Sequence, residues 1–464
     1  MKLHSLSIFG TSSDAGKSTL SFAITYLLKQ YGINVAPFKA QNVSNNSMVT
    51  DLDTGEIAIP QAFAAEAIGL KTIPAMNPVL LKSGGKNKAH MIINGQSVSN
   101  TDVKEYYQNL DTLKPVVKKA FKKLKKEYDC IVAEGAGSPV ELNLMEKDLS
   151  NIYIADEFNT KIILVADIER GGVFASIYGV YNLLPKKLQK NVIGVIVNKF
   201  RGDISLFDEG IRIIEEQFKI PVLGVVPYKP FNLGFEDSAS LINYKQNKPY
   251  SSIKVAVINL PHMSNFTDFE PLIVDQEVEL HFITNPVQAQ LYDLVILPGS
   301  KRVVDDLLWL RKNGFEPFFK DKSKNIIAIC GGYEMMFETI KDPYKTESKI
   351  EHIEGFGRFK GEVLFQKKKI VKKGTYNTMG IMAEGYEIHN GTTKHNAKKK
   401  KNLYGTFVHG IFENDDLRDT IFQELNPNYQ GYKFKEYKAK SIANFAQHIK
   451  DHVDIVRVIN ELHD

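Results

Sequence analysis

Cysteine and long apolar runs are both scarce in this 464-residue sequence. Its two cysteines, Cys130 and Cys330, stand far apart, so metal-ligand spacings such as CxxC are absent and a disulfide framework is excluded. No run approaches the ~18 consecutive apolar residues of a membrane-spanning helix. The opening MKLHSLSIFG lacks the long apolar region and the cleavage site of a signal peptide. These absences predict a cytoplasmic protein, in a reducing compartment, with no membrane partner.

An excess of charge of one sign is also lacking. Lys and Arg number 59 and Asp and Glu number 54, and the resulting net charge of +5 is too small over this length to indicate a nucleic-acid partner. A hydrophobic content of 43% with 24% charged residues excludes disordered and collagen-like chains. At roughly 150 residues per domain, the length allows two or three domains.

Short, continuously apolar runs in the first half predict strands that are buried on both faces of a parallel sheet. They are Leu6–Phe9, Val35–Phe38, Cys130–Ala133, Ile162–Ala166, Val192–Val197 and Val222–Val226. Helically spaced leucine and isoleucine residues lie between the first two runs, which favours an α/β, doubly wound domain over residues 1–245.

The polar stretch Asn243–Ser252 predicts a domain boundary. After it, the α/β rhythm repeats over residues 252–464, with strand candidates at Lys254–Leu260, Leu294–Leu297, Ile326–Ile329 and Gly405–Val408. The last segment, Ser441–Asp464, has apolar residues along one side and predicts a helix that docks on its own domain.

The segment Gly10–Thr19 (GTSSDAGKST) follows a predicted strand and opens a predicted helix. Backbone N–H groups of such a loop cradle phosphates, Lys17 would reach the β- and γ-phosphates, and Ser18 would hold Mg²⁺. Five residues separate Gly10 from Gly16, one more than is usual, so the motif strictly begins at Thr11. The expected nucleotide-binding residues of the loop are Thr11, Gly16, Lys17, Ser18 and Thr19.

Two acidic residues follow buried strands, where ligands bind in open parallel sheets. Glu134 lies in VAEGAG and Asp167 in ADIERGG, and either could bind Mg²⁺ directly or through water, or instead cap a following turn. Asp53 and Glu56 are weaker candidates because DLDTGE is also good turn chemistry.

A reactive thiol is predicted at Cys330, where an apolar strand runs into Cys-Gly-Gly and a helix is expected through Phe337. This is the pattern of a nucleophile elbow, and a helix N-terminus would lower the thiol pKa. The amide of Gly331 and a donor at Gly299 would form the oxyanion hole, and His409 would be the base. The alternative, a buried structural cysteine, is favoured for Cys130, which lies inside a strand.

A phosphate loop joined to a Cys/His domain suggests a glutamine-dependent amidoligase, and the chain closely resembles the cobyric acid synthase family of cobalamin-biosynthesis amidotransferases. The motifs that carry this resemblance run in order across nearly the whole chain. They are Gly10–Thr19, Pro37–Asn42 (PFKAQN), Met76–Lys82 (MNPVLLK), Glu134–Pro139 (EGAGSP), Ala166–Phe174 (ADIERGGVF), Asn198–Asp203 (NKFRGD), Ser264–Phe269 (SNFTDF), Leu297–Lys301 (LPGSK), Cys330–Tyr333 and Gly385–Gly391 (GYEIHNG).

The resemblance implies an ATP-dependent synthetase domain similar to dethiobiotin synthetase, followed by a class I-type glutamine amidotransferase domain. It implies ATP and Mg²⁺ as cofactors, and a corrinoid and glutamine as substrates. The b, d, e and g carboxylates of adenosylcobyrinic acid a,c-diamide would be amidated. Lys39 would correspond to the active-site lysine of dethiobiotin synthetase, Glu134 to its metal-binding glutamate, and Asn198 would lie in the nucleotide site.

Three residues depart from the family pattern. Ala328 replaces a glycine before the elbow, and Glu334 stands where glutamine is usual, so its charge is expected to weaken glutamine binding. Ile411 stands where ordinary class I glutaminases have the glutamate of His-x-Glu, which predicts a Cys/His dyad without an orienting carboxylate.

Other functions remain open at this point. One is the related cobyrinic acid a,c-diamide synthase, although PFKAQN and MNPVLLK argue against it. Another is a partition-type switch ATPase, which carries a signature lysine where this chain has Ser12. A binding module with an inactive glutaminase is the third. The oligomeric state is left open.

Overall fold

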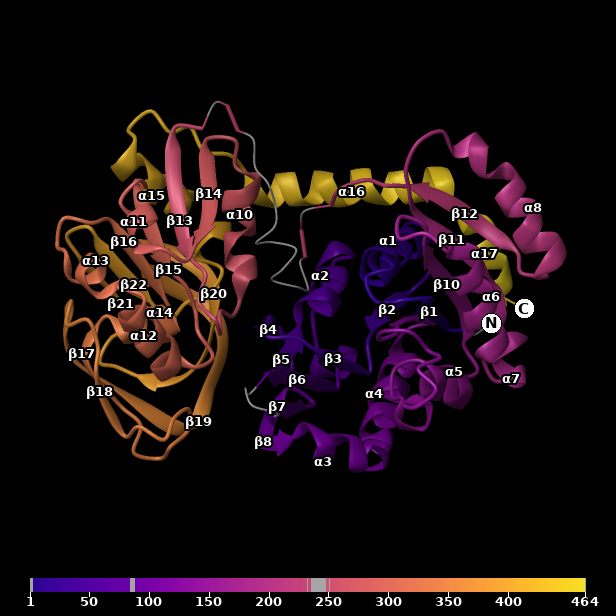
Figure 1. The fold of residues 1–464 in the computed structure, drawn as a ribbon, viewed down its shortest axis with the longest axis horizontal. Coiled ribbons are helices and arrows are strands. Elements are labelled where there is room, and N and C mark those ends of the chain that lie inside the picture. Colours follow the sequence, from indigo (N-terminus) through magenta and orange to yellow (C-terminus); the bar gives the residue numbers. More distant parts are fainter. Residues whose placement is uncertain (1–2, 84–87, 232, 235–247, 250, 464) are drawn as a thin grey trace. The chain divides into compact units, whose positions relative to one another are not determined.

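The computed structural model describes residues 3–83, 88–231, 233–234, 248–249 and 251–463, which form two compact units (Figure 1). Unit 1 comprises Met1–Ser44, Thr50–Phe231 and Lys438–Asp464, and unit 2 comprises Asn45–Val49 and Asn232–Tyr437. The predicted ranges 1–245 and 252–464 therefore differ from these units at residues 45–49 and 438–464, and also after Phe231, because unit 2 begins at Asn232. Most of the predicted boundary stretch, Asn243–Ser252, lies outside the described residues.

Unit 1 contains a six-stranded parallel sheet in the order β12-β11-β10-β1-β9-β2. Each strand contains one of the apolar runs expected from the sequence. The bounds are β1 Leu6–Gly10, β2 Val35–Phe38, β9 Cys130–Glu134, β10 Lys161–Asp167, β11 Val192–Phe200 and β12 Val222–Pro227. Strands β1 and β9 are buried at every residue, as expected for strands that are covered on both faces.

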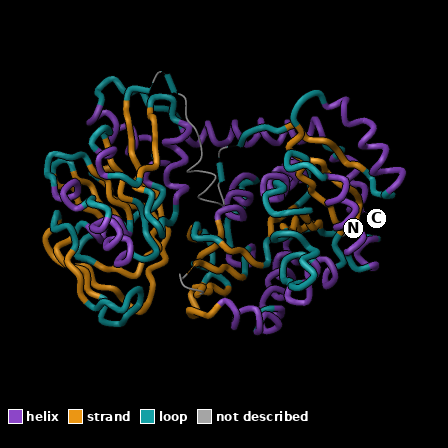
Figure 2. Tube along the Cα trace, in the orientation of Figure 1, coloured by secondary structure: helices purple, strands orange, loops and turns teal. Residues whose placement is uncertain are grey.

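Helices surround this sheet (Figure 2). Unit 1 also contains a smaller sheet, in the order β3-β6-β7-β8. The helices are α1 Lys17–Gln30, α2 Ile59–Ala67, α3 Val103–Gln108, α4 Lys114–Glu127, α5 Ile152–Phe158, α6 Val173–Leu183, α7 Lys186–Gln189 and α8 Asp208–Gln217. The further strands are β3 Gln41–Val43, β5 Glu56–Ala58, β6 Val79–Ser83, β7 Lys88–Ile93 and β8 Gln96–Asp102. The carboxyl ends of β1, β9 and β10 lead into the predicted phosphate-site motifs.

Unit 2 is built on a second sheet, in the order β14-β13-β15-β16-β22-β21, that is parallel except at its edge strand β21. Its strands are β13 Ile253–Ile258, β14 Val278–Ile283, β15 Leu294–Leu297, β16 Ile326–Ile329, β21 Ala397–Lys400 and β22 Leu403–Thr406. Its helices are α10 Glu270–Val274, α11 Pro286–Ala289, α12 Val303–Lys312, α13 Glu316–Lys320, α14 Gly331–Met335 and α15 Asp415–Leu425. The α/β architecture predicted for both halves is confirmed.

A second sheet of unit 2 has no counterpart in the sequence prediction. Its order is β18-β17-β19-β20, and β19 and β20 form a long antiparallel pair, drawn among the orange strands of Figure 2. The bounds are β17 Phe337–Lys341, β18 His352–Glu354, β19 Phe359–Thr378 and β20 Ile381–Thr392. The short strand β4, Ser47–Val49, also belongs to unit 2 but is not part of this sheet. The prediction that the helix after Cys330 continues through Phe337 is wrong, because α14 ends at Met335 and Phe337 begins β17.

The C-terminal segment forms two helices, α16 (Phe434–His452) and α17 (Ile455–His463). Phe445 of α16 lies 5.6 Å from Phe22 and 4.7 Å from Phe231 between ring centroids, and all three belong to unit 1. The prediction of a helix docked on the second domain is therefore wrong, because its amphipathic face packs on the first. In the part of the chain that the structure describes, no helix combines the length and apolarity that crossing a membrane requires.

Candidate functional site

The predicted phosphate loop connects β1 to α1 and is held by backbone and side-chain contacts. The side-chain amide of Asn198 donates to the Ala15 carbonyl at 2.9 Å. Gly16 has a φ of 94°, and a Cβ there would lie 2.1 Å from Asn198 Nδ2, so this position requires glycine. Asn198, expected in the nucleotide site, thus supports the loop itself. The Lys17 ammonium is buried and donates to the Ser12 carbonyl at 3.1 Å, inside the loop.

The predicted residues Ser18, Lys39 and Glu134 come together in unit 1. Oε1 of Glu134 accepts from the Ser18 hydroxyl and from the Lys39 ammonium, each at 2.7 Å. Lys39 and Glu134 are 5% and 3% exposed, so this ion pair is largely removed from water. The other carboxylate oxygen accepts from the Gln61 amide at 3.2 Å. Ser18 lies in the first turn of α1, so this centre is next to a helix N-terminus, a position that favours anionic groups.

The motif MNPVLLK has a structural role that the sequence did not reveal. The Asn77 side chain donates to the carbonyl of Lys39 at 3.0 Å and accepts from the amide of Ala58 at 3.1 Å. The amide of Lys39 donates to the carbonyl of Met76 at 2.9 Å. This motif therefore fixes the backbone from which the Lys39 side chain extends toward Glu134.

The residues around Glu134 fit Mg²⁺. Ser18 and Glu134 offer adjacent oxygen atoms, and Gln61 Oε1 is buried without a hydrogen-bond partner among the described residues. Mg²⁺ commonly takes one or two protein oxygens and completes its shell with water and substrate phosphates. No group of three or more His, Cys, Asp or Glu residues that could hold a metal occurs in the described ranges.

Asp167 is not among the residues that contact Ser18 and Glu134. Its carboxylate lies 3.0 Å from the Lys199 ammonium and 3.8 Å from Nε of Arg170, so two cations already neutralise it. The weaker candidates lie elsewhere too: Asp53 pairs with a surface lysine, and the buried Glu56 pairs with Lys82. Of the acidic candidates, only Glu134 therefore contacts the phosphate loop.

In unit 2, Cys330 directly follows β16 and has a φ of 50° and a ψ of −112°, a strained conformation for a residue other than glycine. The glycines after it allow a close approach to the neighbouring strand, since a Cβ at Gly332 would lie 2.2 Å from the Leu297 carbonyl oxygen. These features form the predicted nucleophile elbow. The thiol is buried and donates to the Ile388 carbonyl at 3.7 Å.

The predicted lowering of the thiol pKa is wrong for this structure. Burial, reinforced by the carboxyl group of Glu334, raises the pKa of the Cys330 thiol well above its ordinary value of 9.0. Helix α14 has only five residues, so its N-terminus does not offset the loss of water. The cysteine therefore rests as a neutral thiol.

The predicted oxyanion glycines lie beside the elbow. A Cβ at Gly331 would be 2.8 Å from the Ser300 amide nitrogen, and one at Gly299 would be 3.2 Å from Cε1 of His409. The loop after β15 thus approaches both the elbow and the imidazole. Backbone amides in this position can stabilise a negative oxygen that forms next to the thiol.

His409 has an orienting carboxylate, contrary to the prediction of a Cys/His dyad. Its Nδ1 lies 2.7 Å from Oδ2 of Asp268, and the other oxygen of Asp268 accepts from the amide of Gly410 at 2.8 Å. Asp268 comes from the motif SNFTDF, which the sequence resemblance included without giving this residue a role. With Nδ1–H donated to Asp268, Nε2 of the neutral ring is the nitrogen that can accept a proton.

The surroundings of Glu334 oppose the charge that the sequence suggested. Burial, reinforced by nearby Glu347, raises the pKa of Glu334 well above its ordinary value of 4.5. The backbone of Gly391 hydrogen-bonds to this carboxyl group, and a Cβ at Gly391 would lie 2.1 Å from its Oε1. This shift favours the protonated carboxyl group, which has nearly the shape of a glutamine side chain.

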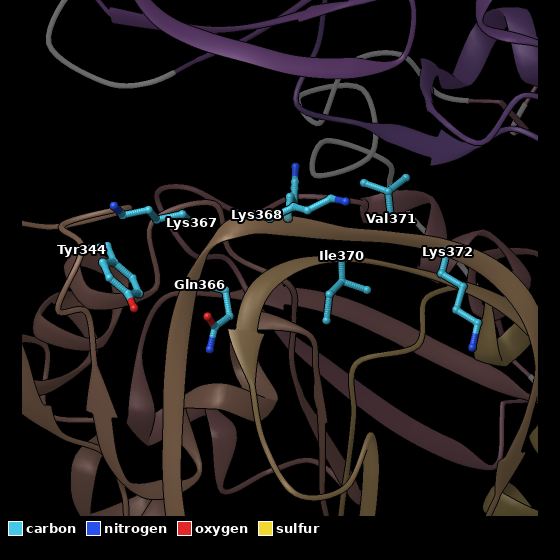
Figure 3. A pocket seen from close by; sticks show the side chains of 8 residues that line it. Tyr344, Gln366, Lys367, Lys368, Ile370, Val371 and Lys372 are labelled. Carbon is cyan, nitrogen blue, oxygen red and sulfur yellow. The ribbon is translucent and has the colours of Figure 1, made fainter.

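An open groove of about 720 Å³ lies along the bulged part of β19 (Figure 3). It is lined by Tyr344, Gln366, Lys367, Lys368, Lys369, Ile370, Val371 and Lys372. The four lysines give this surface a positive character that attracts anions. Cys330 and His409 are not among its lining residues.

Comparisons with known proteins agree with this two-part geometry. A family model described as "CobQ/CobB/MinD/ParA nucleotide binding domain" matches residues 6–232, and one described as "CobB/CobQ-like glutamine amidotransferase domain" matches residues 254–417. Among solved structures, a crystal structure of glutamine amidotransferase covers 37% of this chain and 97% of that chain, with 12% identity and a TM-score of 0.30, which is too low to carry an argument.

Curated relatives match almost the whole chain. The cobyric acid synthase of Acinetobacter baylyi is 53% identical and covers 99% of this chain and 99% of its own length. Those of Clostridium tetani and Clostridium acetobutylicum are 37% and 39% identical; the first match covers 98% of each chain, and the second covers 90% of this chain and 89% of the relative. The chain therefore belongs to the cobyric acid synthase family and is a glutamine-hydrolysing ligase.

Proposed function

We propose that this enzyme uses ATP and glutamine to amidate the b, d, e and g carboxylates of adenosylcobyrinic acid a,c-diamide, giving adenosylcobyric acid. The observation that carries the proposal is the pairing, in one chain, of the Ser18–Glu134–Lys39 centre with the Cys330 elbow and its His409–Asp268 pair. The first suits carboxylate activation by a nucleotide, and the second suits release of ammonia from an amide.

In the first half of the reaction, the γ-phosphoryl group of ATP passes to a substrate carboxylate. This activation is needed because a carboxylate itself is a poor electrophile. Lys17 and Lys39 neutralise the charge that develops on the phosphate and carboxylate oxygens. Mg²⁺, when bound, would be held by Ser18 and Glu134 and would supply further neutralisation of the phosphate oxygens. The products of this step are an acyl phosphate and ADP.

In the second half of the reaction, the Cys330 sulfur attacks the side-chain amide carbon of glutamine, and the thiol proton passes to Nε2 of His409. The amides near Gly331 and Gly299 stabilise the negative oxygen of the tetrahedral intermediate. His409 returns the proton to the leaving ammonia, and the thioester is then hydrolysed to glutamate. The ammonia displaces phosphate from the acyl phosphate and forms the new amide.

The test uses purified enzyme with the a,c-diamide, ATP and glutamine that carries heavy nitrogen in its side-chain amide. We expect four successive incorporations of the label, observed by mass spectrometry, with one glutamate and one ADP formed for each. Incorporation into cobyrinic acid lacking the a and c amides, with the a,c-diamide left untouched, would contradict this assignment and favour the diamide-forming relative.

A further inference from the structure

The segment Asn45–Val49 belongs to unit 2 by its contacts, although in the chain it follows the motif PFKAQN of the synthetase half. The side-chain amide of Asn265 donates to the Ser47 carbonyl at 2.9 Å. The hydroxyl of Thr267 donates to Oδ1 of Asn46 at 3.3 Å. The motif SNFTDF, which also supplies Asp268, therefore holds this segment through two polar side chains.

The side-chain amide of Asn265 also contacts a residue that lies against the imidazole of His409. Asn265 is 4% exposed, and its Nδ2 also donates to the Tyr386 hydroxyl at 3.0 Å. The Tyr386 ring stacks on His409, with centroids 5.4 Å apart and an interplanar angle of 24°. Tyr386 and His409 also exchange two backbone hydrogen bonds, of 3.2 and 2.8 Å. One side chain thus connects the backbone of Ser47 to the ring that lies against the proposed base.

Apolar contacts connect the segment to the thiol. Val49 is fully buried in a cluster with Tyr386 and Ile388, and Val371, which is labelled in Figure 3, packs against this cluster. The carbonyl of Ile388 is the group that accepts the hydrogen bond from the Cys330 thiol. The neighbours of both proposed catalytic groups therefore pack on the same valine.

In this arrangement the thiol and the imidazole are not joined. Within the described residues, no hydrogen bond links Cys330 to His409, and the thiol proton is directed at Ile388 instead. Burial keeps the thiol pKa high, so the resting centre is poorly set for attack on an amide. Proton transfer requires the thiol to turn from the Ile388 carbonyl toward Nε2 of His409.

We propose that Asn265 and the segment Asn45–Val49 are positioning residues of the glutaminase centre, which set the imidazole through Tyr386 and the thiol through Ile388. This inference rests on the proposed function, because it takes Cys330 and His409 to be the groups that release ammonia from glutamine.

The test compares wild type with Asn265→Ala and Val49→Ala. Val255→Ala is the matched control, because Val255 is equally buried in β13 and belongs to the large core cluster of unit 2 instead of the Tyr386 cluster. Glutamate release is measured with and without ATP and corrinoid, and amidation from ammonium is measured in parallel. We expect glutamate release by both test variants to fall at least about tenfold, since a displacement of ~1 Å in a catalytic group can cost about 100-fold.

We further expect both test variants to keep synthesis from ammonium, so that the loss is confined to glutamate release. Val255→Ala should keep glutamate release even if it lowers the melting temperature. Wild-type glutamate release in both test variants, or an equal loss in Val255→Ala, overturns the proposal. If wild type fails to amidate the a,c-diamide, the proposed function is wrong, but the comparison of basal glutamate release still tests the positioning role.

Discussion

Nδ1 of His409 lies 2.7 Å from Oδ2 of Asp268, although the two residues are 141 positions apart in the chain. The contact is buried, because the side chains of His409 and Asp268 are 1% and 3% exposed. Asp268 is also anchored by the amide of Gly410, so its carboxylate is fixed relative to the loop that carries His409. Under the proposed function, Asp268 would be the orienting acid of a triad in which His409 is the base and Cys330 the nucleophile.

Replacement of Asp268 by asparagine should remove glutamine-dependent synthesis and leave synthesis from ammonium. The asparagine amide would donate to Nδ1, so the proton would move to Nε2, the nitrogen needed as base. The comparable change in a serine protease costs about 10,000-fold, and we expect at least about a 100-fold loss in kcat for glutamate release. Equal rates for Asp268→Asn and wild type would show that His409 is oriented by other groups.

The position of Asp268 illustrates what the sequence can and cannot provide. Local sequence patterns were enough to predict the strand before Cys330 and the phosphate loop, because apolar runs and glycine spacing can be read within a short segment. The partner of His409 was sought two residues away, where the chain has Ile411. The actual carboxylate comes from a distant turn and is brought close only by the fold.

The same reasoning explains the errors in the domain ranges. Amphipathicity predicts that the last helix buries one face, but it does not say which domain provides the matching surface. Phe445 packs with Phe22 and Phe231, and no periodicity within the helix identifies those partners. Similarly, residues 45–49 lie in the first half of the chain but take their contacts from unit 2.

Cys330→Ser should abolish glutamine-dependent synthesis, by more than about 1,000-fold, because the thioester can no longer form at a useful rate. Synthesis from added ammonium should remain near the wild-type rate, since the proposed role of Cys330 is confined to ammonia production. Both rates are measured by mass spectrometry of the corrinoid. A folded variant that lost both activities would contradict the separation into two sites.

Lys17→Ala should block synthesis from both nitrogen sources, because carboxylate activation precedes amide formation whatever supplies the nitrogen. Under the proposed function, Lys17 would neutralise the phosphates of ATP, and its loss should cost at least about 100-fold in the rate of synthesis. Lys123→Ala is the matched control, because Lys123 lies on the surface of α4 and pairs with Asp53. Full synthesis from ammonium by Lys17→Ala would contradict the assignment of the phosphate loop.

Glu334→Gln separates a neutral carboxyl group from a charged one. Because burial raises the native pKa of Glu334 above the ordinary value of 4.5, the folded chain binds more protons than the unfolded chain between these two values. The contribution of Glu334 to stability therefore falls as pH rises through this window, by up to about 1.4 kcal/mol per pH unit, and the loss is complete above the native pKa. Glutamine cannot ionise and removes this slope.

We expect Glu334→Gln to resemble wild type in the KM for glutamine where Glu334 is protonated, and to be the more stable of the two as pH rises. The comparison variant is Glu347→Gln. Burial also raises the pKa of Glu347, to about 8, so this change removes the slope of Glu347 itself and, by removing a neighbouring carboxyl group, lowers the pKa of Glu334. Its stability should therefore vary less with pH than that of wild type and level off at a lower pH. Denaturant unfolding and the KM for glutamine are measured between about pH 5 and about pH 9. If Glu334 were ionised throughout, the variant would differ from wild type by a constant free energy and its KM would be lower at every pH. If the stability curves of wild type and Glu334→Gln run parallel with pH and the KM of the variant is uniformly lower, Glu334 is charged in the native protein, as expected from the sequence.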